Sequence, residues 1–328
     1  MDFLADYLPF AAKALTVALL LAAPLVLVIV ARGRAATRQE ETRLVVRKLN
    51  ERHEDARLSL EAAMLPPREF KARVKQVTKA RKGAPAATRR LYVCNFHGDM
   101  RATGVSSLRE EISAILSVAN DGDEVAVVLE SAGGTLHGYG LAASQLERVR
   151  ARGLRLTVLV DKVAASGGYM MACVADSIVA APFAIIGSIG VVAQLPNFNR
   201  LLRRHDIDFE LVTAGRHKRT LTLFGENTSE GRAKFQAELD EAHRLFKAFI
   251  TQHRPGLDIE QVATGEYWLA TRARELGLVD ALATSDAFLI ERMAEFDVLE
   301  IRSERRRGLA ARLLGPLESR LARALEQT

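Results

Sequence analysis

Ser166 and Lys218 are the residues of this 328-residue chain whose types and settings are best suited to chemistry. Ser166 follows the apolar run LTVLVDKVAA and precedes GGYMMACVA, so we expect it at the start of a helix just beyond a buried strand. A serine gains reactivity there, because the helix dipole favours developing negative charge and the N–H of Gly167 is free to donate. The same position also suits an ordinary helix cap.

A serine nucleophile needs a base, and the sequence contains no Gly-x-Ser-x-Gly elbow and no histidine and aspartate at catalytic spacing. Lys218 lies in the turn TAGRHKR, after the run DFELVTA, for which we expect a strand. A lysine can act as a base where burial lowers its pKa toward neutrality, although most lysines are solvated surface residues. His217 is the nearest rival, and the histidines form no metal-binding pattern.

Three glycine-bearing turns lie in the same part of the chain: SAGG at 131–134, ASGG at 165–168 and GSIG at 187–190. None of them is a dinucleotide-binding or phosphate-binding glycine loop. Glycines after an apolar strand allow backbone N–H groups to converge on one point, as an oxyanion hole requires. They can equally serve only as strand-to-helix turns, so each turn taken alone is weak evidence.

The elements that must position these residues alternate along the chain. From residue 91 onward, apolar runs typical of strands (LYVCNF, VAVVLE, LRLTVLV) are separated by stretches typical of helices (VSSLREEISAILSVAN, LHGYGLAASQLERVRARG). This order predicts an α/β fold with right-handed βαβ crossovers. Further strands are expected at IVAA and IIGSIGVVA, and a long amphipathic helix at 229–253.

Several of these motifs, in this order, carry a family resemblance: DKVAASGGYMMACVAD, APFAIIGSIGVVAQLPNF, TAGRHKRTLTLFGENT and LGLVD. The chain resembles the signal peptide peptidase A family, in its SohB branch of membrane-anchored serine peptidases with a ClpP/crotonase-like βαβ superhelical domain. The similarity runs from the amino-terminal apolar segment to about residue 300. What this implies is an endopeptidase with a Ser/Lys dyad, in which Ser166 is the nucleophile and Lys218 the general base.

The resemblance also assigns supporting roles. Ser188 of GSIG matches the serine that hydrogen-bonds the lysine, and the oxyanion hole is expected from the N–H groups of Gly134 and Gly167, assisted by Gly133. It implies a peptide or protein substrate, a homo-oligomer and neither a metal nor an organic cofactor. Two departures affect the geometry near the substrate: Ala132 stands where the family usually has proline, and Ala270 where relatives often have glycine.

Three functions remain open at this point. The first is a membrane-tethered peptidase that cuts released signal peptides or fragments of membrane proteins. The second is a crotonase-like acyl-CoA enzyme, which shares the fold and the oxyanion turns but gives no reason for Ser166 and Lys218 to occur together. The third is a catalytically inactive membrane scaffold of the same fold, whose behaviour would not change on mutation of Ser166.

The charge distribution excludes other classes. Residues 32–90 hold 17 Lys and Arg against 7 Asp and Glu, a net +10, so the rest of the chain sums to −4 within the total of +6. A basic excess confined to one segment beside an apolar stretch disfavours a nucleic-acid binder. Cys94 and Cys173, both in apolar runs and without a CxxC partner, exclude a disulfide scaffold and a structural zinc site.

The amino terminus predicts a membrane anchor. No charged residue lies between Ala14 and Ala31, and 18 residues of helix rise about 27 Å, close to the thickness of the hydrocarbon core. Basic residues concentrate after this run, so the positive-inside rule places the following domain in the cytoplasm. We expect the segment to cross the inner (plasma) membrane once. A second uncharged run, 177–199, contains prolines and glycines and is read as buried core.

The predicted organisation has four parts. Residues 1–31 carry the transmembrane helix, and 32–90 form a basic linker of two helices broken at Pro66-Pro67, suited to contact with anionic lipid. Residues 91–298 form the peptidase domain. Residues 299–328 form a basic amphipathic tail that could lie on the membrane or pack on a partner subunit.

Overall fold

A computed structural model describes residues 42–83 and 89–305. The predicted membrane span at 14–31 lies outside these residues, as does the predicted tail at 299–328 apart from residues 299–305. Those residues form part of a strand, β10 (Asp297–Arg305), so the peptidase domain extends beyond its predicted end at residue 298. No helix within 42–83 and 89–305 combines the length and the apolar character needed to cross a membrane. The chain divides into two compact units, and the unit Val45–Arg302 contains nearly all of the described residues.

A parallel sheet forms the centre of this unit, as the alternating pattern predicted. The strand order is β1-β10-β2-β3-β4-β6-β9, and all the pairings from β10 to β9 are parallel. The strands are β1 (Thr42–Lys48), β2 (Arg90–His97), β3 (Glu124–Glu130), β4 (Arg155–Val160), β6 (Ser177–Ala180), β9 (Ala281–Leu282) and β10 (Asp297–Arg305). Apolar β-branched runs suit these strands, because both faces of a parallel sheet are buried. The chain therefore has an α/β fold.

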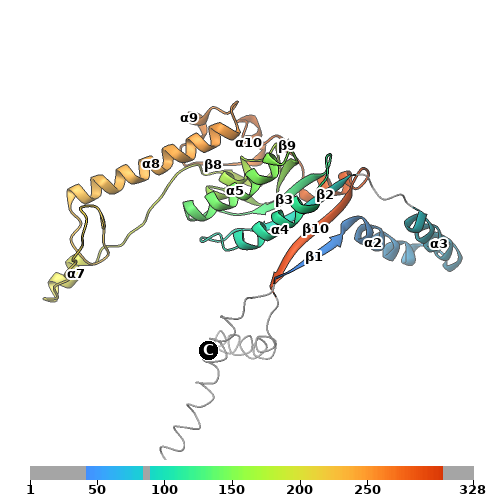
Figure 1. The fold of residues 1–328 in the computed structure, drawn as a ribbon, viewed down its shortest axis with the longest axis horizontal. Helices are drawn as coiled ribbons and strands as arrows, with labels where there is room; N and C mark the ends of the chain where they lie inside the picture. Colours follow the sequence, from blue (N-terminus) through green and yellow to red (C-terminus); the bar gives the residue numbers. More distant parts are fainter. Residues whose placement is uncertain (1–41, 84–88, 306–328) are drawn as a thin grey trace, which may run out of the picture. The chain divides into compact units, whose positions relative to one another are not determined.

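Alternation along the strands divides the core between the two faces of the sheet. In β2, Tyr92, Cys94 and Phe96 join the larger apolar cluster, whereas Leu91 and Val93 join the smaller one. The larger cluster is completed by helices α4 (Val105–Val118), α5 (Leu136–Ala151) and α6 (Gly167–Ala172); Figure 1 shows α4 and α5 lying along the sheet. The smaller cluster is covered by the start of α2 (Leu49–Met64) and by α11 (Ser285–Arg292).

A second, three-stranded sheet positions the predicted site. It consists of β5 (Val163–Ala165), β7 (Ile185–Gly187) and β8 (Tyr267–Leu269), with β5 and β7 parallel and β7 and β8 antiparallel. A single bridge between Ser131 and Ala164 connects it to the end of β3. The strand expected at IIGSIGVVA is therefore shorter than predicted, because regular pairing ends at Gly187.

The segment after β7 extends away from the sheet. It contains α7 (Asn199–Arg204) and leads into α8 (Ser229–His253), whose bounds match the predicted helix; α9 (Ile259–Val262) and α10 (Ala270–Glu275) follow. The strand predicted for DFELVTA is absent from the structure, and that prediction was wrong. Residues 208–214 are all exposed, so no apolar face and no partner strand is present to order them as a strand.

Two helices separated at Pro66 follow β1, as predicted for the linker. These helices are α2 and α3 (Pro67–Gly83). Helix α3 is strongly basic, and its side chains neutralise acidic side chains of α2. Arg73 pairs with Glu54 and Glu61, and Arg81 pairs with Asp55. The β1 strand before them was not predicted, because its residues TRLVVRK carry the same charge density as the helices.

Candidate active site

Ser166 occupies a strained backbone position at the junction of β5 and α6. Its φ is 52° and its ψ −119°, a conformation that favours glycine. The N–H of Ser166 donates to the carbonyl of Gly187 at 2.7 Å, and its carbonyl accepts from the N–H of Met170 at 3.0 Å. The hydroxyl makes no capping bond to the helix, so this serine is held in an unfavourable conformation without acting as an ordinary cap.

Ser188 lies beside Ser166 because of strand register. Ala165 pairs with Gly187 across β5 and β7, and the two serines are the next residue on each strand. Neighbouring strands lie about 4.8 Å apart, so the serines are adjacent. Ser188 also has a left-handed φ of 51°, and its N–H donates to the carbonyl of Glu266 at 2.7 Å.

The SAGG turn is in contact with the ASGG turn. Gly133 has a φ of +94°, and a Cβ placed on it would lie 2.7 Å from the Ser166 Cβ and 2.7 Å from the Gly167 nitrogen. This close approach is possible only for glycine. Gly133 of one turn and the consecutive residues Ser166 and Gly167 of the other, all predicted site residues, therefore meet at one place.

The three predicted oxyanion donors differ in their hydrogen bonding. The N–H of Gly133 donates to the Ser131 hydroxyl oxygen at 3.0 Å and is therefore engaged. The N–H groups of Gly134 and Gly167 donate to no partner among the residues described. Gly167 begins α6, where backbone N–H groups have no partner within the helix. Two free backbone donors thus flank Ser166.

Lys218 lies elsewhere in the same chain. Its side chain is exposed in the segment between α7 and α8. Thr220 lies against the first turn of α8, since its carbonyl oxygen is 2.3 Å from where a Gly231 Cβ would be. The buried residues of α8 are Phe246 and Ile250, near its other end, and the 15 residues from 231 to 246 span about 22 Å of helix. Figure 1 shows α7 and its neighbouring loops at the end of α8 away from α5.

The structure therefore brings Ser166 together with Ser188 and the glycine turns, but not with Lys218. No hydrogen bond or ion pair joins the Ser166 side chain to a titratable group in the described part of the chain. His217, the rival base, is exposed in the same segment as Lys218. Residues 42–83 and 89–305 contain no cluster of His, Cys, Asp or Glu suited to hold a metal ion.

Two residues of the site were not predicted. The Ser131 hydroxyl lies 2.6 Å from the Tyr139 hydroxyl, which donates to the carbonyl of Asp99 at 2.8 Å. Both side chains are almost fully buried. Tyr139 falls on the buried face of α5, where sequence pattern alone cannot separate a hydrogen-bonded tyrosine from an ordinary core residue.

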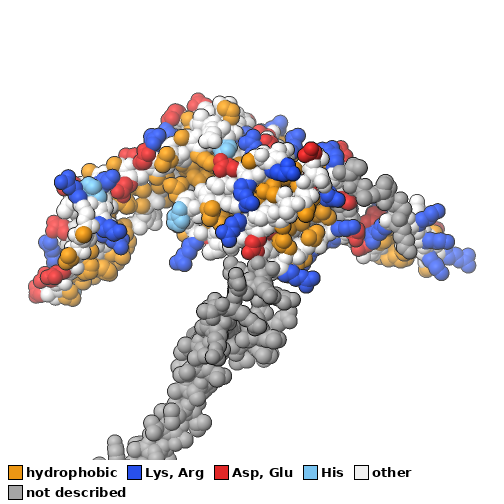
Figure 2. All heavy atoms as spheres, viewed as in Figure 1, with side chains coloured by type: hydrophobic (Ala, Val, Ile, Leu, Met, Phe, Trp, Pro, Cys, Tyr) orange, Lys and Arg blue, Asp and Glu red, His pale blue; other side chains and the backbone are white. Residues whose placement is uncertain are grey.

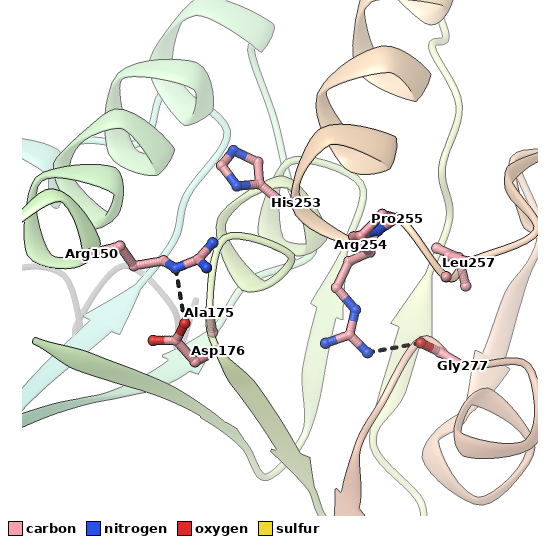
Figure 3. Close-up of a pocket in the computed structure, with 9 residues that line it drawn as sticks. Arg150, Ala175, Asp176, His253, Arg254, Pro255, Leu257 and Gly277 are labelled. Atoms are coloured by element: carbon pink, nitrogen blue, oxygen red, sulfur yellow. Dashed lines mark hydrogen bonds and ion pairs between the residues drawn. The ribbon is translucent and has the colours of Figure 1, made fainter. Parts of the chain in front are cut away.

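A polar pocket of about 400 Å³ lies beyond the carboxyl end of α6, the end away from Ser166. Figure 3 shows its lining residues, among them Arg150, Asp176 and Arg254. Its charged side chains neutralise one another: Arg150 pairs with Asp176 at 3.0 Å, and Arg254 pairs with Asp280 at 2.8 Å. Burial tends to raise the pKa of Asp280, but hydrogen bonds from Arg254 and the Ile178 N–H outweigh it, and the pKa is lowered. The pocket is lined by α5, by the turn between α6 and β6, and by the end of α8 with the residues that follow it; none of these lining residues is a nucleophile.

The two cysteines carry no chemistry of their own. Cys94 and Cys173 are fully buried and unpaired. Burial raises the pKa of both thiols, so neither forms a reactive thiolate at neutral pH. This agrees with their prediction as buried core residues.

Comparison with known proteins identifies the class. The chain matches the N-terminal model of peptidase family S49 over residues 2–146 and the model of peptidase family S49 over residues 148–299. The chain belongs to peptidase family S49, as the motifs predicted.

Its relatives include two proteins named probable protease SohB. The one from Haemophilus influenzae is 58% identical over 219 residues, which are 67% of this chain and 62% of that protein. The one from Buchnera aphidicola is 58% identical over 237 residues, which are 72% of this chain and 70% of that protein. The match thus spans less than two thirds of the length of the Haemophilus protein.

Two solved structures are distantly similar. One is a serine-to-alanine mutant of a membrane-bound stomatin-specific protease, with a TM-score of 0.39 and 14% identity over 63% of this chain and 85% of that chain. The other is a lysine-to-alanine mutant of the same protease in complex with a substrate peptide, with a TM-score of 0.41 and 12% identity over 70% and 97% of the two chains.

Proposed function

We propose that this protein is a serine endopeptidase of the ClpP/crotonase-like fold, with Ser166 as nucleophile and Lys218 as general base. The observation that carries the proposal is the strained Ser166 at the start of α6, flanked by free N–H groups of Gly134 and Gly167. Membership of a peptidase family supports the same activity. The cost of the strain, roughly 1–3 kcal/mol, is typical of a functional position.

The reaction follows from this arrangement. The Ser166 oxygen attacks the peptide carbonyl carbon while its proton passes to the neutral Lys218 amine. The negative charge formed on the carbonyl oxygen is stabilised by the N–H groups of Gly134 and Gly167. The carbon–nitrogen bond then breaks as the lysine returns its proton to the leaving amine. Water, deprotonated by the same lysine, hydrolyses the acyl-enzyme and restores Ser166.

Lys218 reaches Ser166 in this proposal from a second copy of the chain. Within one chain Lys218 is exposed at the far end of α8, and its side chain lacks the burial that a lysine base requires. A homo-oligomer in which this segment covers the Ser166 site of a neighbour supplies both the proximity and the burial. Ser188, adjacent to Ser166, is placed to hydrogen-bond the arriving amine.

The surface of the extended segment supports such an assembly. Phe198 and Phe209 both pack on Phe224, with ring centroids 6.0 and 5.6 Å apart. These rings remain partly exposed in one chain, together with other large apolar side chains nearby, and Figure 2 shows hydrophobic side chains along this part of the molecule. An apolar surface of this kind is characteristic of a protein–protein contact. The residues are Val192, Leu195, Phe198, Leu201, Ile207, Phe209, Leu211, Val212, Leu223 and Phe224.

Mixing two inactive variants tests the shared dyad. Ser166→Ala and Lys218→Ala should each abolish detergent-solubilised hydrolysis of a fluorogenic hydrophobic peptide. After the two are unfolded and refolded together, random assembly should restore about a quarter of wild-type activity, because half of the contributed serines and half of the contributed lysines are intact. The double variant mixed with Ser166→Ala is the matched control and should remain inactive.

The outcomes separate the parts of the proposal. Full activity of Ser166→Ala would remove the serine peptidase assignment and favour a scaffold. Two inactive single variants whose co-assembled mixture stays inactive would place the dyad within one chain and contradict the shared site.

We further propose that the peptidase is anchored in the inner membrane by residues 14–31 and cuts signal peptides or fragments of membrane proteins. The α3 side chains of Arg68, Lys71, Lys75 and Lys79 are exposed and make no ion pair within the described residues, which supports contact with anionic lipid. Flanking charge favours a cytoplasmic catalytic domain. Alkaline phosphatase fused after residue 90 should then be inactive in cells, and high phosphatase activity would contradict this orientation.

A further inference from the structure

A chain of hydroxyl groups lies beneath the SAGG turn, and the direction of each hydrogen bond in it can be assigned. The Tyr139 hydroxyl has one proton and donates it to the carbonyl of Asp99 at 2.8 Å. The Ser131 hydroxyl must therefore donate to the Tyr139 oxygen, 2.6 Å away. The Ser131 oxygen is then free to accept the N–H of Gly133 at 3.0 Å.

Tyr139 and Ser131 also touch the start of α6. A Cβ on Gly167 would lie 2.4 Å from the Tyr139 ring, and a Cβ on Gly168 would lie 2.5 Å from the carbonyl oxygen of Ser131. Helix α6 is thus seated directly on these two residues. The position of the Gly167 N–H and the orientation of the Gly133 peptide are set by the same buried pair.

The far end of the hydroxyl chain is itself rigid. The carboxylate of Asp99 accepts hydrogen bonds from the N–H of Arg101 at 3.1 Å and of Thr103 at 2.9 Å, and from the Thr103 hydroxyl. The carbonyl oxygen of the next residue, Met100, accepts a hydrogen bond from the N–H of Thr135 at 2.9 Å, and the Met100 backbone lies against Gly134. The turn at 99–103 therefore holds the SAGG turn at both of its ends. Asp99 acts on Ser131 through the Tyr139 hydroxyl, and Met100 binds Thr135, the residue after Gly134.

We propose that Tyr139 is a positioning residue for the oxyanion hole: its hydroxyl, acting through Ser131, fixes the Gly133–Gly134 turn so that the Gly134 and Gly167 N–H groups face one point. This inference rests on the proposed function of Ser166. A phenylalanine would fill the same core volume, so the hydroxyl itself, buried and bonded only toward the turns, is what packing does not require.

Tyr139→Phe tests the inference, with Tyr169→Phe as the matched control. Tyr169 is equally buried, and its hydroxyl donates to one backbone carbonyl, that of Leu278, at 3.1 Å. In Tyr139→Phe we expect kcat to fall about 10- to 100-fold with KM within about two-fold, because the misaligned donors act only on the transition state. A peptide aldehyde, whose tetrahedral adduct needs the same donors, should bind more weakly by a similar factor.

Tyr169→Phe should keep its kcat within about two-fold of the wild-type value, while its loss of thermal stability should be similar to that of Tyr139→Phe. Equal losses of kcat in the two variants would overturn the inference, because a general weakening of the core would then explain both. A rise of KM with unchanged kcat in Tyr139→Phe would also overturn it.

Hydrogen–deuterium exchange gives a readout that needs no activity. In the Ser166→Ala background, Tyr139→Phe should speed exchange in peptides covering 131–135 and leave those from α4 unchanged, and Ser131→Ala should do the same. Unchanged exchange at 131–135 in both variants would overturn the positioning role. A wild-type protein without Ser166-dependent hydrolysis would refute the proposed function, and the exchange comparison would still decide the role of Tyr139.

Discussion

Ser166→Gly should stabilise the protein while abolishing its activity. Ser166 has φ 52° and ψ −119°, and a non-glycine residue held in such a region costs roughly 1–3 kcal/mol. Glycine adopts this conformation freely but loses about 0.5–1 kcal/mol more backbone entropy on folding. The net expectation is a stabilisation of about 1 kcal/mol relative to Ser166→Ala, which keeps the Cβ and the strain.

The structure indicates that little else changes. The backbone N–H of residue 166 keeps its bond to the Gly187 carbonyl, and the serine hydroxyl caps no helix N–H. Ser166→Ala removes the same hydroxyl, so the comparison isolates the Cβ. For a unit of this size, about 1 kcal/mol corresponds to a rise of roughly 2–4 °C in the melting temperature.

The assay is thermal unfolding of the wild type and both variants in the same detergent, with peptide hydrolysis measured in parallel. Both variants should be inactive, and Ser166→Gly should melt above Ser166→Ala. A Ser166→Gly protein that melts at or below Ser166→Ala would refute the reasoning, because the conformation at residue 166 would then store no strain.

Two further predictions concern packing and charge. Gly167→Ala should cost about 1–3 kcal/mol of stability and most of the activity, because its Cβ would meet the Tyr139 ring at 2.4 Å. Gly140→Ala is the control and should be tolerated, since a Cβ there has nothing within 4 Å. Urea unfolding of both variants checks this prediction, and equal stability of the two would contradict the packing argument. Asp280→Asn should destabilise by about 1 kcal/mol at pH 7. The lowered pKa of Asp280 means that its ionised form, paired with Arg254, favours the folded state, so its contribution is present above the unfolded value of about 3.9 and disappears as the pH falls through the lower folded value. The difference in melting temperature between the wild type and Asp280→Asn should therefore shrink as the pH falls below about 3.9, and a difference that does not shrink there would exclude this linkage.

Sequence pattern predicted the central sheet well because its signal is local. The strands at 91–96, 125–130 and 154–160 are apolar runs of β-forming residues, and the helices between them show clear periodicity. The place of Ser166 at the start of a helix followed from the same local pattern.

The sequence could not show which residues meet. The proximity of Ser166 to Ser188 depends on the register of β5 against β7, and the contact of Ser166 with Gly133 depends on a bridge between two sheets. The failed strand at 208–214 shows the same limit: its alternating residues suit a strand, but the structure offers them no partner. Local propensity is overridden wherever tertiary packing is missing.

The shallow attachment of α8 has a consequence for how this chain can change over evolutionary time. Of its 25 residues only Phe246 and Ile250 are buried, so substitutions at the exposed positions of the first four turns, away from Gly231, should change the stability of the chain to which they belong only slightly. Selection on that stretch then acts mainly through what it contacts outside its own chain. The residues around Ser166, packed on Tyr139 and on one another, have no such freedom. Variation within one polypeptide is therefore governed by two separate constraints, one set by folding and the other by association.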